Sequence, residues 1–333
     1  MKKRGLTGAV VAVVISVLSL SGGCGHVSIP SSAILVPHAA DSVARLEIAQ
    51  ILADEDFARL YGVYASTNPE LPRTIDLALA DLKDETGIDL RQVEEATLFA
   101  SLPTLETEDP YWGAIVTWKI PARQLFLIAE WASALDFETE DYSGLKLYGL
   151  QEGLSLAFLS STVLAVGPER AVKEVVDVGL GRGAAWGGQL REEYVAFGDV
   201  PVKAVLEVPP AVTRELSAGP VPEGGLGGDA GPLVDLETLG FLLDKQGSAV
   251  SVRMELGFSA SQSASSLAVL IELLLSGTGG VSLAPELANV LDGASVAVSG
   301  AVVSLLLDTT VSELEELLAY LAAEGTSPGL PWQ

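Results

Sequence analysis

Two distant stretches of the chain, 154–178 and 294–318, follow the same order of strand, turn, strand and helix. Each has two short apolar runs around a turn and then apolar residues at helical spacing. A strand-like run leads into a helical segment ahead of each stretch, at 115–120 with a helix from Pro121 and at 250–256 with a helix over 266–275. We therefore expect an α+β fold with an antiparallel sheet, helices on one face and two related β-α-β-β-α halves. The alternative is that any α+β chain yields such runs without duplication.

Hydrophobic periodicity predicts the remaining elements. Further helices are expected over 41–64, 74–87, 188–197, 233–245 and from Val311, and further strands over 96–102, 111–120, 145–150 and 202–208. In the strand over 202–208, the alternation of Val202, Ala204, Leu206 and Val208 predicts one buried face. The helix over 266–275 has only Glu272 among apolar residues, so we expect it to be covered on most sides.

The chain begins with a short basic segment, Lys2 to Arg4, and an apolar block over 6–20. These are the first two regions of a secretory signal, and the block is short for a membrane span of about 20 apolar residues. Small residues then precede Cys24, the only cysteine in the chain. Secreted proteins that use disulfides carry cysteines in pairs, so a solitary thiol here favours a modification site over a disulfide or a metal ligand. An ordinary signal peptide, or an uncleaved anchor, is the alternative.

The segment Leu20-Ser21-Gly22-Gly23-Cys24 resembles a bacterial lipobox. It departs from the usual pattern at Ser21, where an aliphatic residue is common. The resemblance implies that residues 1–23 are removed, that the Cys24 thiol carries lipid such as palmitate, and that the protein is held on the extracytoplasmic face of the cell membrane or the outer membrane. Several acyl chains, each stabilised by about 0.8 kcal/mol per buried methylene, provide such an anchor.

The expected domain organisation follows from these segments and from composition. Residues 24–40 lack periodicity and contain Pro30 and Pro37, so we expect a tether. A Gly/Pro-rich stretch, 219–232, is the expected linker or long loop. The expected divisions are a signal peptide at 1–23, a tether at 24–40, a first α+β module at 41–218, the linker at 219–232, a second α+β module at 233–325 and a tail at 326–333.

The body also resembles a broad group of bacterial secreted proteins and lipoproteins built from duplicated α+β modules and of unknown function. The resemblance rests on strands that end in Val-Gly and lead to Ala-Val, as at Val166-Gly167 and Ala171-Val172. It covers about residues 40–325 and implies no activity.

The charge balance excludes one class of partner. The chain has 44 acidic and 19 basic residues, a net charge of −25, and loss of the signal makes it more negative. Such a surface repels the phosphate backbone, so we expect no nucleic-acid partner. The acids are spread along the chain, which is typical of a solubilising surface.

The small number and the positions of the histidine and cysteine residues exclude several kinds of site. The two histidines, His26 and His38, fall in the expected tether, so the body has no imidazole for a catalytic triad and no His or Cys for zinc. Gly280-Val-Ser282 has only a distant likeness to a nucleophile elbow. We therefore expect no catalytic residue, no metal and no cofactor.

Three further patterns have simpler interpretations. The acidic stretch 136–144 lacks the spacing of a calcium loop, so we expect a solvated hairpin loop. Residues 54–56 are read as the exposed face of a helix. Gly179 to Ala184 fits a dinucleotide-loop pattern but follows a helix instead of a strand, so it is read as a helix end and exit turn.

These observations favour a non-enzymatic, membrane-anchored binding or envelope protein. A carrier or sensor of apolar ligands is one alternative, because the many Val and Leu residues could line a groove. A carboxylate-dependent hydrolase such as a glycosidase is another, because paired acids need no histidine. Trp112 and Trp118 lie on one face of a strand and could line a sugar site, although a core position is the simpler expectation. The partner, protein or apolar small molecule, stays open.

Overall fold

The computed structural model describes residues 32–67, 93–102, 109–118, 138–149, 153–213, 233, 235–276 and 285–323. The chain divides into two compact units, Met1–Asp54 with Asn68–Gly187, and Glu55–Thr67 with Gly188–Gln333. The second unit therefore begins well before the linker expected at 219–232, which lies outside the described residues, and the first module expected at 41–218 extends too far. Both units combine helices with antiparallel strands, as the α+β prediction requires.

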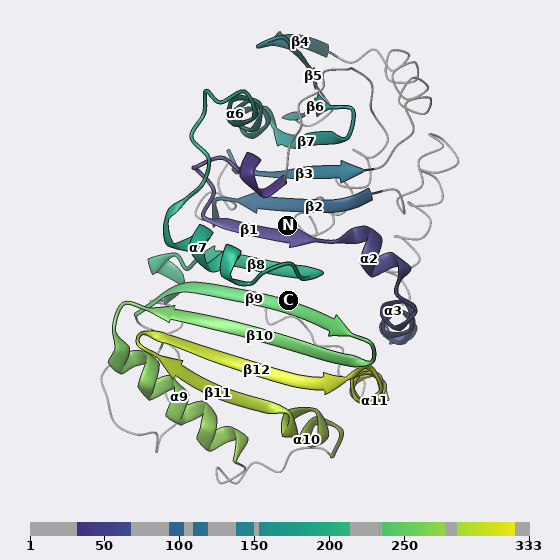
Figure 1. Ribbon diagram of the computed structural model, residues 1–333, viewed down its shortest axis with the longest axis vertical. Helices are drawn as coiled ribbons and strands as arrows, with labels where there is room; N and C mark the ends of the chain where they lie inside the picture. Colours follow the sequence, from purple (N-terminus) through teal and green to yellow (C-terminus); the bar gives the residue numbers. More distant parts are fainter. Residues whose placement is uncertain are drawn as a thin grey trace, which may run out of the picture. The chain divides into compact units, whose positions relative to one another are not determined.

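The first unit is built on an antiparallel sheet with the strand order β1-β2-β3-β7-β6-β5-β4 (Figure 1). Its strands are β1 Ser42–Leu46, β2 Val93–Ala100, β3 Trp112–Trp118, β4 Glu138–Tyr142, β5 Leu145–Gly149, β6 Leu154–Ser160 and β7 Val163–Pro168. β6 and β7 are nearly continuous apolar runs because side chains on both faces of this hairpin are buried.

One helix covers the β6–β7 hairpin. α6 Glu169–Gly179 packs against β7, β6 and β3 with Val172, Val175 and Val176 buried, as its helical spacing predicts. It ends as expected, because Leu180 and Gly181 donate backbone hydrogen bonds to Val176 and Val178 and Gly181 has a positive φ. The Gly179–Ala184 segment is thus a helix end and exit turn.

The start of the body differs from the prediction. Ser32–Leu35 forms a 3-10 helix, η1, whose Leu35 is buried, and the backbone N–H of His38 donates to the carbonyl of Ala184. The tether prediction is therefore wrong for residues 32–40, because apolar side chains in this segment join the core. Residues 24–31 lie outside the described residues.

The helix expected over 41–64 is also wrong in its first part. β1 is a strand that pairs with β2, and only after it do α2 Ile48–Ala53 and α3 Glu55–Thr67 begin. Val43 is the buried residue of β1, and all five residues of the strand pair with β2, so ladder hydrogen bonds decide the conformation. The acidic residues 54–56 are not simply an exposed face, because Asp56 forms ion pairs with Arg59 and Lys245.

The second unit has the antiparallel strand order β11-β12-β10-β9-β8. Its elements are α3, α7 Gly188–Ala196, β8 Val202–Glu207, β9 Leu236–Gln246, β10 Ala249–Phe258, α9 Ser261–Leu275, α10 Pro285–Asp292, β11 Ala294–Ser299, β12 Val302–Thr310 and α11 Val311–Ala323. β9 occupies the segment expected as a helix over 233–245. That prediction is wrong because Leu236 to Gln246 pairs with strands on both sides.

The strand order agrees with the predicted repeat. In the first unit β3 pairs with β7, and β7 pairs with β6. In the second unit β10 pairs with β12, and β12 pairs with β11. Each unit thus adds the second strand of a hairpin to a preceding strand and then continues into a helix, α6 or α11. The helices expected at 74–87 and from Pro121 lie outside the described residues.

Helices lie on both faces of the second sheet, contrary to the prediction of one covered face. Ala264 and Ala268 of α9 join the core formed with Leu256 and Val303. On the other face the Phe197 ring, just after α7, fills the place of a side chain at Gly240. β8 is accordingly covered on both faces, and Lys203 and Val205 are buried although the sequence predicts burial of the alternate residues.

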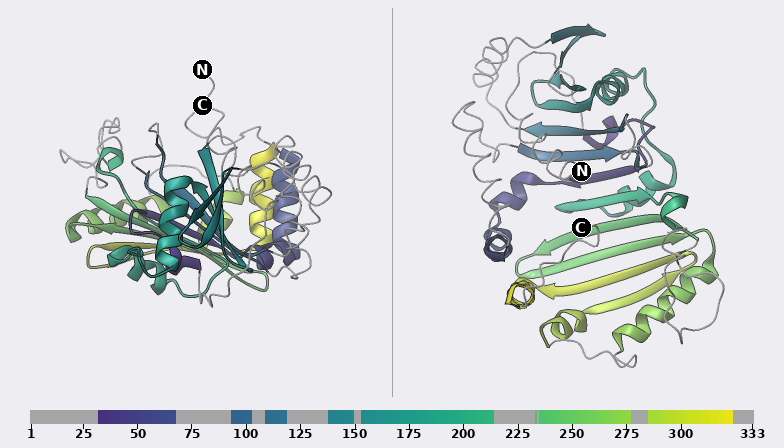
Figure 2. Two further views of the ribbon diagram at one scale, coloured as in Figure 1. Left: turned by 90° about the horizontal axis from the view of Figure 1, so that it is seen from above. Right: turned by 180° about the vertical axis from the view of Figure 1, so that it is seen from behind.

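Two further observations complete the second unit. α3 and α11 lie side by side, as Figure 2 shows in its view from above. α9 is less covered than expected, because Val269, Leu270 and Leu273 are exposed. Among the helices that the structure describes, none is long and apolar enough to cross a membrane.

Candidate functional site

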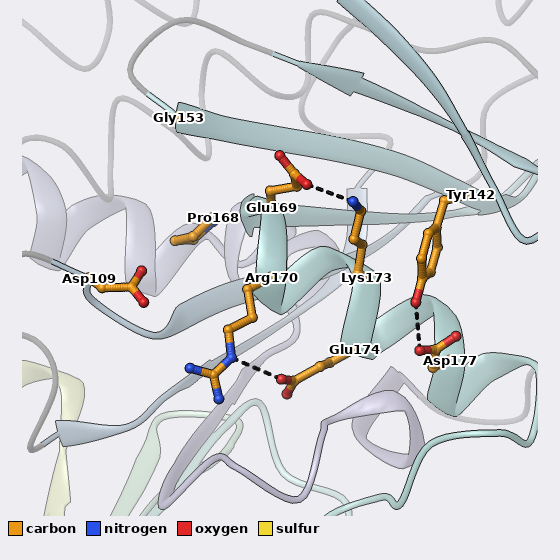
Figure 3. Close-up of a pocket in the computed structure, with 9 residues that line it drawn as sticks. All are labelled: Asp109, Tyr142, Gly153, Pro168, Glu169, Arg170, Lys173, Glu174 and Asp177. Atoms are coloured by element: carbon orange, nitrogen blue, oxygen red, sulfur yellow. Dashed lines mark hydrogen bonds and ion pairs between the residues drawn. The ribbon is translucent and has the colours of Figure 1, made fainter.

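A polar groove of about 500 Å³ lies beside α6 in the first unit (Figure 3). Its described lining residues come from the length of α6, from β4 and from the segments before β3 and β6: Asp109, Tyr142, Gly153, Pro168, Glu169, Arg170, Lys173, Glu174 and Asp177. The groove exists because α6 is amphipathic. Its valines face the sheet, while charged residues at spacings of three and four line the opposite side.

Glu174 is one of two carboxylates of the groove that are held by both a tyrosine and an arginine. The Tyr111 hydroxyl donates to Glu174 Oε2 at 2.6 Å, and Arg170 Nε donates to Glu174 Oε1 at 3.1 Å. The Arg170 guanidinium also lies 5.4 Å from the centroid of the Tyr111 ring. Burial, and then the hydrogen bond to Glu174, raise the pKa of Tyr111 well above its ordinary value. This phenol therefore stays a donor, not a base.

A second tyrosine and carboxylate pair closes the other end of the groove. The Tyr142 hydroxyl donates to Asp177 Oδ2 at 2.8 Å, and Arg182 Nη2 donates to Asp177 Oδ1 at 2.6 Å. The hydrogen bond to Asp177 is the main cause that raises the pKa of Tyr142. Figure 3 shows this pair at one end of the groove and the pair of Arg170 with Glu174 along its lower side.

Lys173 lies between these two pairs. Its Nζ donates to Glu169 at 2.6 Å and to Glu140 of β4 at 3.0 Å, and it lies 5.2 Å from the Tyr142 ring centroid. Its hydrogen bonds to Glu140 and Glu169 raise the pKa of Lys173, so it remains a cation. The described residues of the groove therefore form pairs of opposite charge beside one half-buried aromatic ring, Tyr142.

This arrangement favours recognition over reaction. The carboxylates of Glu174 and Asp177 accept hydrogen bonds from tyrosine and arginine and hold their orientation. Among the described residues that line the groove there is no histidine, cysteine or serine. In the described parts of the chain, no three His, Cys, Asp or Glu side chains are grouped so that they could hold a metal ion. A polar or charged partner is the ligand that such a lining can bind through hydrogen bonds.

The residues considered from sequence are not brought together in this groove. Cys24, His26 and Ser282 lie outside the described residues, and His38 is exposed. Trp118 is buried in the core, and its indole N–H donates to the Ser161 carbonyl at 3.2 Å. Trp112 is half-buried and does not line the groove. The acidic stretch forms β4 and its turn at Ser143–Gly144, which agrees with an exposed hairpin.

The sequence did not lead to a prediction of the groove, although the charged pairs of α6 that line it can be recognised in the sequence. The pairs Glu169 with Lys173 and Arg170 with Glu174 follow the i,i+4 rule and could have been identified on the predicted helix. Tyr111 and Tyr142 lie far from α6 in sequence, and no local pattern connects them with it. Tyr111 and Tyr142 come close to α6 only because the strands of the sheet pair as they do.

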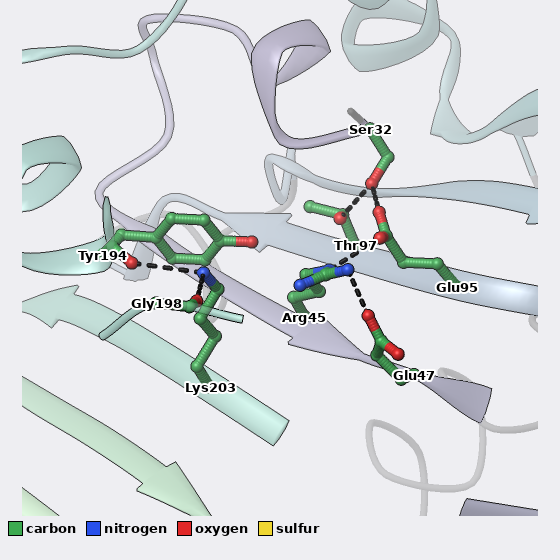
Figure 4. A network of polar contacts seen from close by, with 8 residues as sticks. All are labelled: Ser32, Arg45, Glu47, Glu95, Thr97, Tyr194, Gly198 and Lys203. Atoms are coloured by element: carbon green, nitrogen blue, oxygen red, sulfur yellow. Dashed lines mark hydrogen bonds and ion pairs between the residues drawn. The ribbon is translucent and has the colours of Figure 1, made fainter. Parts of the chain in front are cut away.

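Two buried polar clusters, drawn in Figure 4, have structural roles. In the first unit, Arg45 of β1 forms ion pairs with Glu95 and Glu47, and the Ser32 hydroxyl bonds to Glu95 and Thr97. This cluster holds η1 against the sheet.

In the second unit, the buried Lys203 donates to the carbonyls of Gly198 at 2.6 Å and Tyr194 at 3.3 Å. Its Nζ also lies 4.1 Å from the centroid of the Tyr194 ring. A cation at the carboxyl end of α7 stabilises that helix end.

The sequence matches no protein-family model and no curated protein. Among solved structures, crystal form III of TP0453 aligns with 89% of this chain and 100% of its own, at 10% identity and a TM-score of 0.45. Crystal form I of TP0453 aligns with 88% of this chain and 98% of its own, at 11% identity and a TM-score of 0.46.

Proposed function

We propose that this protein is a lipid-anchored, extracytoplasmic envelope protein without enzymatic activity, and that it binds a protein partner through the groove beside α6. The observation that carries the proposal is the groove lining, in which Tyr142 and five charged residues of α6 form hydrogen bonds. Tyrosine and arginine are enriched where protein interfaces are energetically strongest.

The polar lining distinguishes this proposal from its two alternatives. A carrier of apolar ligands needs an enclosed apolar cavity, whereas this groove is open and charged. A carboxylate-dependent glycosidase needs two acids free to exchange protons, and tryptophan often lines sugar sites. Glu174 and Asp177 of this groove are bound to tyrosine and arginine, and the described part of its lining contains no tryptophan.

The proposed location rests on the N-terminal sequence. The basic start, the apolar block and the small residues before the single cysteine favour cleavage before Cys24 and lipidation of its thiol. Since several acyl chains are needed for stable anchoring, the complete modification would hold the protein on its membrane. The proposed membrane is the cell membrane or the outer membrane.

The anchor makes one prediction. Cys24→Ser removes the only thiol, so the variant will take up no labelled fatty acid and will move from the membrane to the soluble fraction. Metabolic labelling with palmitate, followed by fractionation, measures both effects. His26→Ser, two residues further on, is the matched control and should keep label and membrane association. An unlabelled wild-type protein would contradict the proposal.

The groove makes a second prediction. A photo-crosslinking amino acid at Glu169, on the exposed rim of the groove, should give a specific protein adduct in intact cells, identified by mass spectrometry. Tyr142→Ala in the same chain should reduce that adduct several-fold because it removes the accessible ring. The same crosslinker at Val195, exposed on α7 of the other unit, is the control position. Identical adducts at both positions, or none at Glu169, would overturn the groove as a binding site.

A further inference from the structure

The distance along the chain from Cys24 to the first unit limits how far that unit can lie from a membrane that holds Cys24. Ser32 is 1% exposed, and eight residue steps separate it from Cys24. A polypeptide extends by at most about 3.6 Å per residue, so Ser32 lies within about 29 Å of the Cys24 Cα atom. A tether that continued to residue 40, as the sequence predicted, would allow twice this distance. The point where the chain enters the first unit is therefore held close to the anchor.

The entering segment lies against the end of α6 and the segment that follows it. η1 packs against α6, β2 and β3. Trp186 donates its backbone N–H to the Val36 carbonyl at 3.0 Å and its indole N–H to the Ala33 carbonyl at 2.7 Å. Residues 32–40 and 179–187 are therefore neighbours in the first unit, and their exposed side chains are called the entry face below.

The entry face has no acidic residue, although the chain has 44 of them. No Asp or Glu occurs at 32–40 or at 178–191, and Arg182 is exposed. The other end of α6, by contrast, has the exposed acids Asp109 and Glu169 beside it. Anionic headgroups repel acidic side chains, so a chain of net charge −25 approaches a membrane at low electrostatic cost where its surface has none.

The exposed side chains of the entry face suit the headgroup level of a bilayer. Ile34 is 38% exposed and Leu180 is 42% exposed. The Arg182 side chain is 49% exposed, and Asp177, which lies beside it, is neutralised by the ion pair between them. Apolar side chains combined with arginine are typical of protein surfaces that lie at the membrane interface.

We propose that the first unit lies with its entry face against the bilayer that holds the lipid of Cys24. The short reach from Cys24 to Ser32 keeps this face near the membrane surface, and anionic headgroups do not repel it because it has no acids. Since Arg182 bonds to Asp177 of the groove, one end of the groove beside α6 then lies next to the membrane. This inference rests on the lipid anchor of the proposed function, but not on the partner of the groove.

The test uses the full-length lipidated protein in vesicles of equal parts phosphatidylethanolamine and phosphatidylglycerol. Because lipid occupies the Cys24 thiol, Leu180→Cys supplies the one free thiol, which is labelled with a small fluorescent dye. A nitroxide on the lipid headgroup, which quenches only at short range, should quench this dye several-fold more than the same dye on Asp109→Cys. Asp109 is the matched control, because it is exposed at the opposite end of α6, a helix of 11 residues and about 16 Å (Figure 3). Equal quenching of the two dyes would overturn the proposal.

Mass spectrometry of the N-terminal peptide separates this inference from the anchor on which it rests. A peptide without lipid would overturn the anchor and the orientation together. A lipidated peptide with equal quenching would overturn the orientation alone. A dye at Leu180 that is shielded in cell membranes but not quenched in these vesicles would show that a protein covers the entry face, and would also overturn the proposal.

A longer tether tests the short reach itself. About 20 Gly and Ser residues inserted after Ser28 form a flexible coil that lets the first unit move away from the bilayer. Quenching of the dye at Leu180 should then fall several-fold, while the lipid and the melting temperature stay as in the protein without the insertion. Unchanged quenching would refute the proposal, because the reach from Cys24 would then not hold the entry face at the membrane.

Discussion

The two hairpins of the repeat, β6–β7 and β11–β12, pair with a preceding strand in the same way but have very different surroundings. Paired positions make this clear. Leu156 faces Val166, and Val296 faces Leu305 at the matching place, yet Leu156 is 1% exposed and Val296 is only half-buried. Phe158 faces Leu164, and Val298 faces Val303. Phe158 is 5% exposed, whereas Val298 is 42% exposed.

The difference follows from what covers each hairpin. β6 has a further strand, β5, on its outer side, and α6 lies on the hairpin itself. In the second unit the corresponding helix, α11, packs mainly against α3, and β11 is the last strand of its sheet among the described residues. The two units therefore share a strand order, but their hairpins are not buried to the same extent. The first hairpin is an interior element, while the second presents a surface.

The largest expected effect concerns Phe158 and Val298, the matched positions whose exposed fractions differ most. Phe158→Ala should reduce the free energy of unfolding by about 3–5 kcal/mol, because a buried ring is replaced by a cavity. Urea unfolding followed by tryptophan fluorescence measures it, since the Trp118 ring lies 6.0 Å from the Phe158 ring. Val298→Ala, the matched variant in the second hairpin, should change stability by no more than about 0.5 kcal/mol, measured by circular dichroism. Similar losses in both would show that the hairpins are equally buried.

A smaller effect on stability should distinguish α6 from α11, the helices that follow the two hairpins. α6 begins after Pro168 without a side-chain cap, whereas α11 has a capping box. Thr310 Oγ1 accepts from the N–H of Glu313, and Glu313 Oε2 accepts from the N–H of Thr310 at 2.8 Å. Thr310→Ala should therefore cost about 1 kcal/mol, measured by hydrogen exchange of the α11 amides. Protection of α6 should not change, and equal losses in both helices would contradict a local cap.

The pH dependence of this cap has a definite sign. Hydrogen bonds from the Thr310 backbone, and then from the Thr309 and Thr310 hydroxyls, lower the pKa of Glu313 below its ordinary 4.5. A lowered pKa contributes stability above pH 4.5 that is lost as the pH falls through the folded value. The difference between wild type and Thr310→Ala should therefore shrink in acid. A difference that stays constant down to pH 2 would exclude Glu313 as its source.

The sequence predicted much of the fold where one local pattern dominated. α6 and the two hairpins with their helices were predicted because their apolar spacing is regular, and β8 was predicted as a strand although its alternate residues are the buried ones. The prediction failed where helix-forming residues lie in a strand, as at Leu236 to Gln246, because pairing with β8 and β10 outweighs local propensity. It also failed at 32–40, where Ser32 and Leu35 are held by residues distant in sequence.

The groove was less predictable than the fold. The charged pairs on α6 are local, but Tyr111 and Tyr142 reach them only through the sheet, and periodicity carries no information about that approach. The burial of Lys203 in the second unit was also not predictable, since a lysine in an alternating strand is expected to face water. It is buried because two carbonyls at the end of α7 need a donor.

The helix α3 has a consequence for how this polypeptide can be made and divided. It is synthesised early, between two segments of the first unit, yet it packs against α11 near the other end of the chain and joins it through Arg59 and Glu315. The second unit therefore cannot be completed until α11 has been synthesised, and such non-local contacts slow folding. A fragment that starts at Gly188 would leave the α3-facing side of α11 bare, so one cut cannot yield two intact halves.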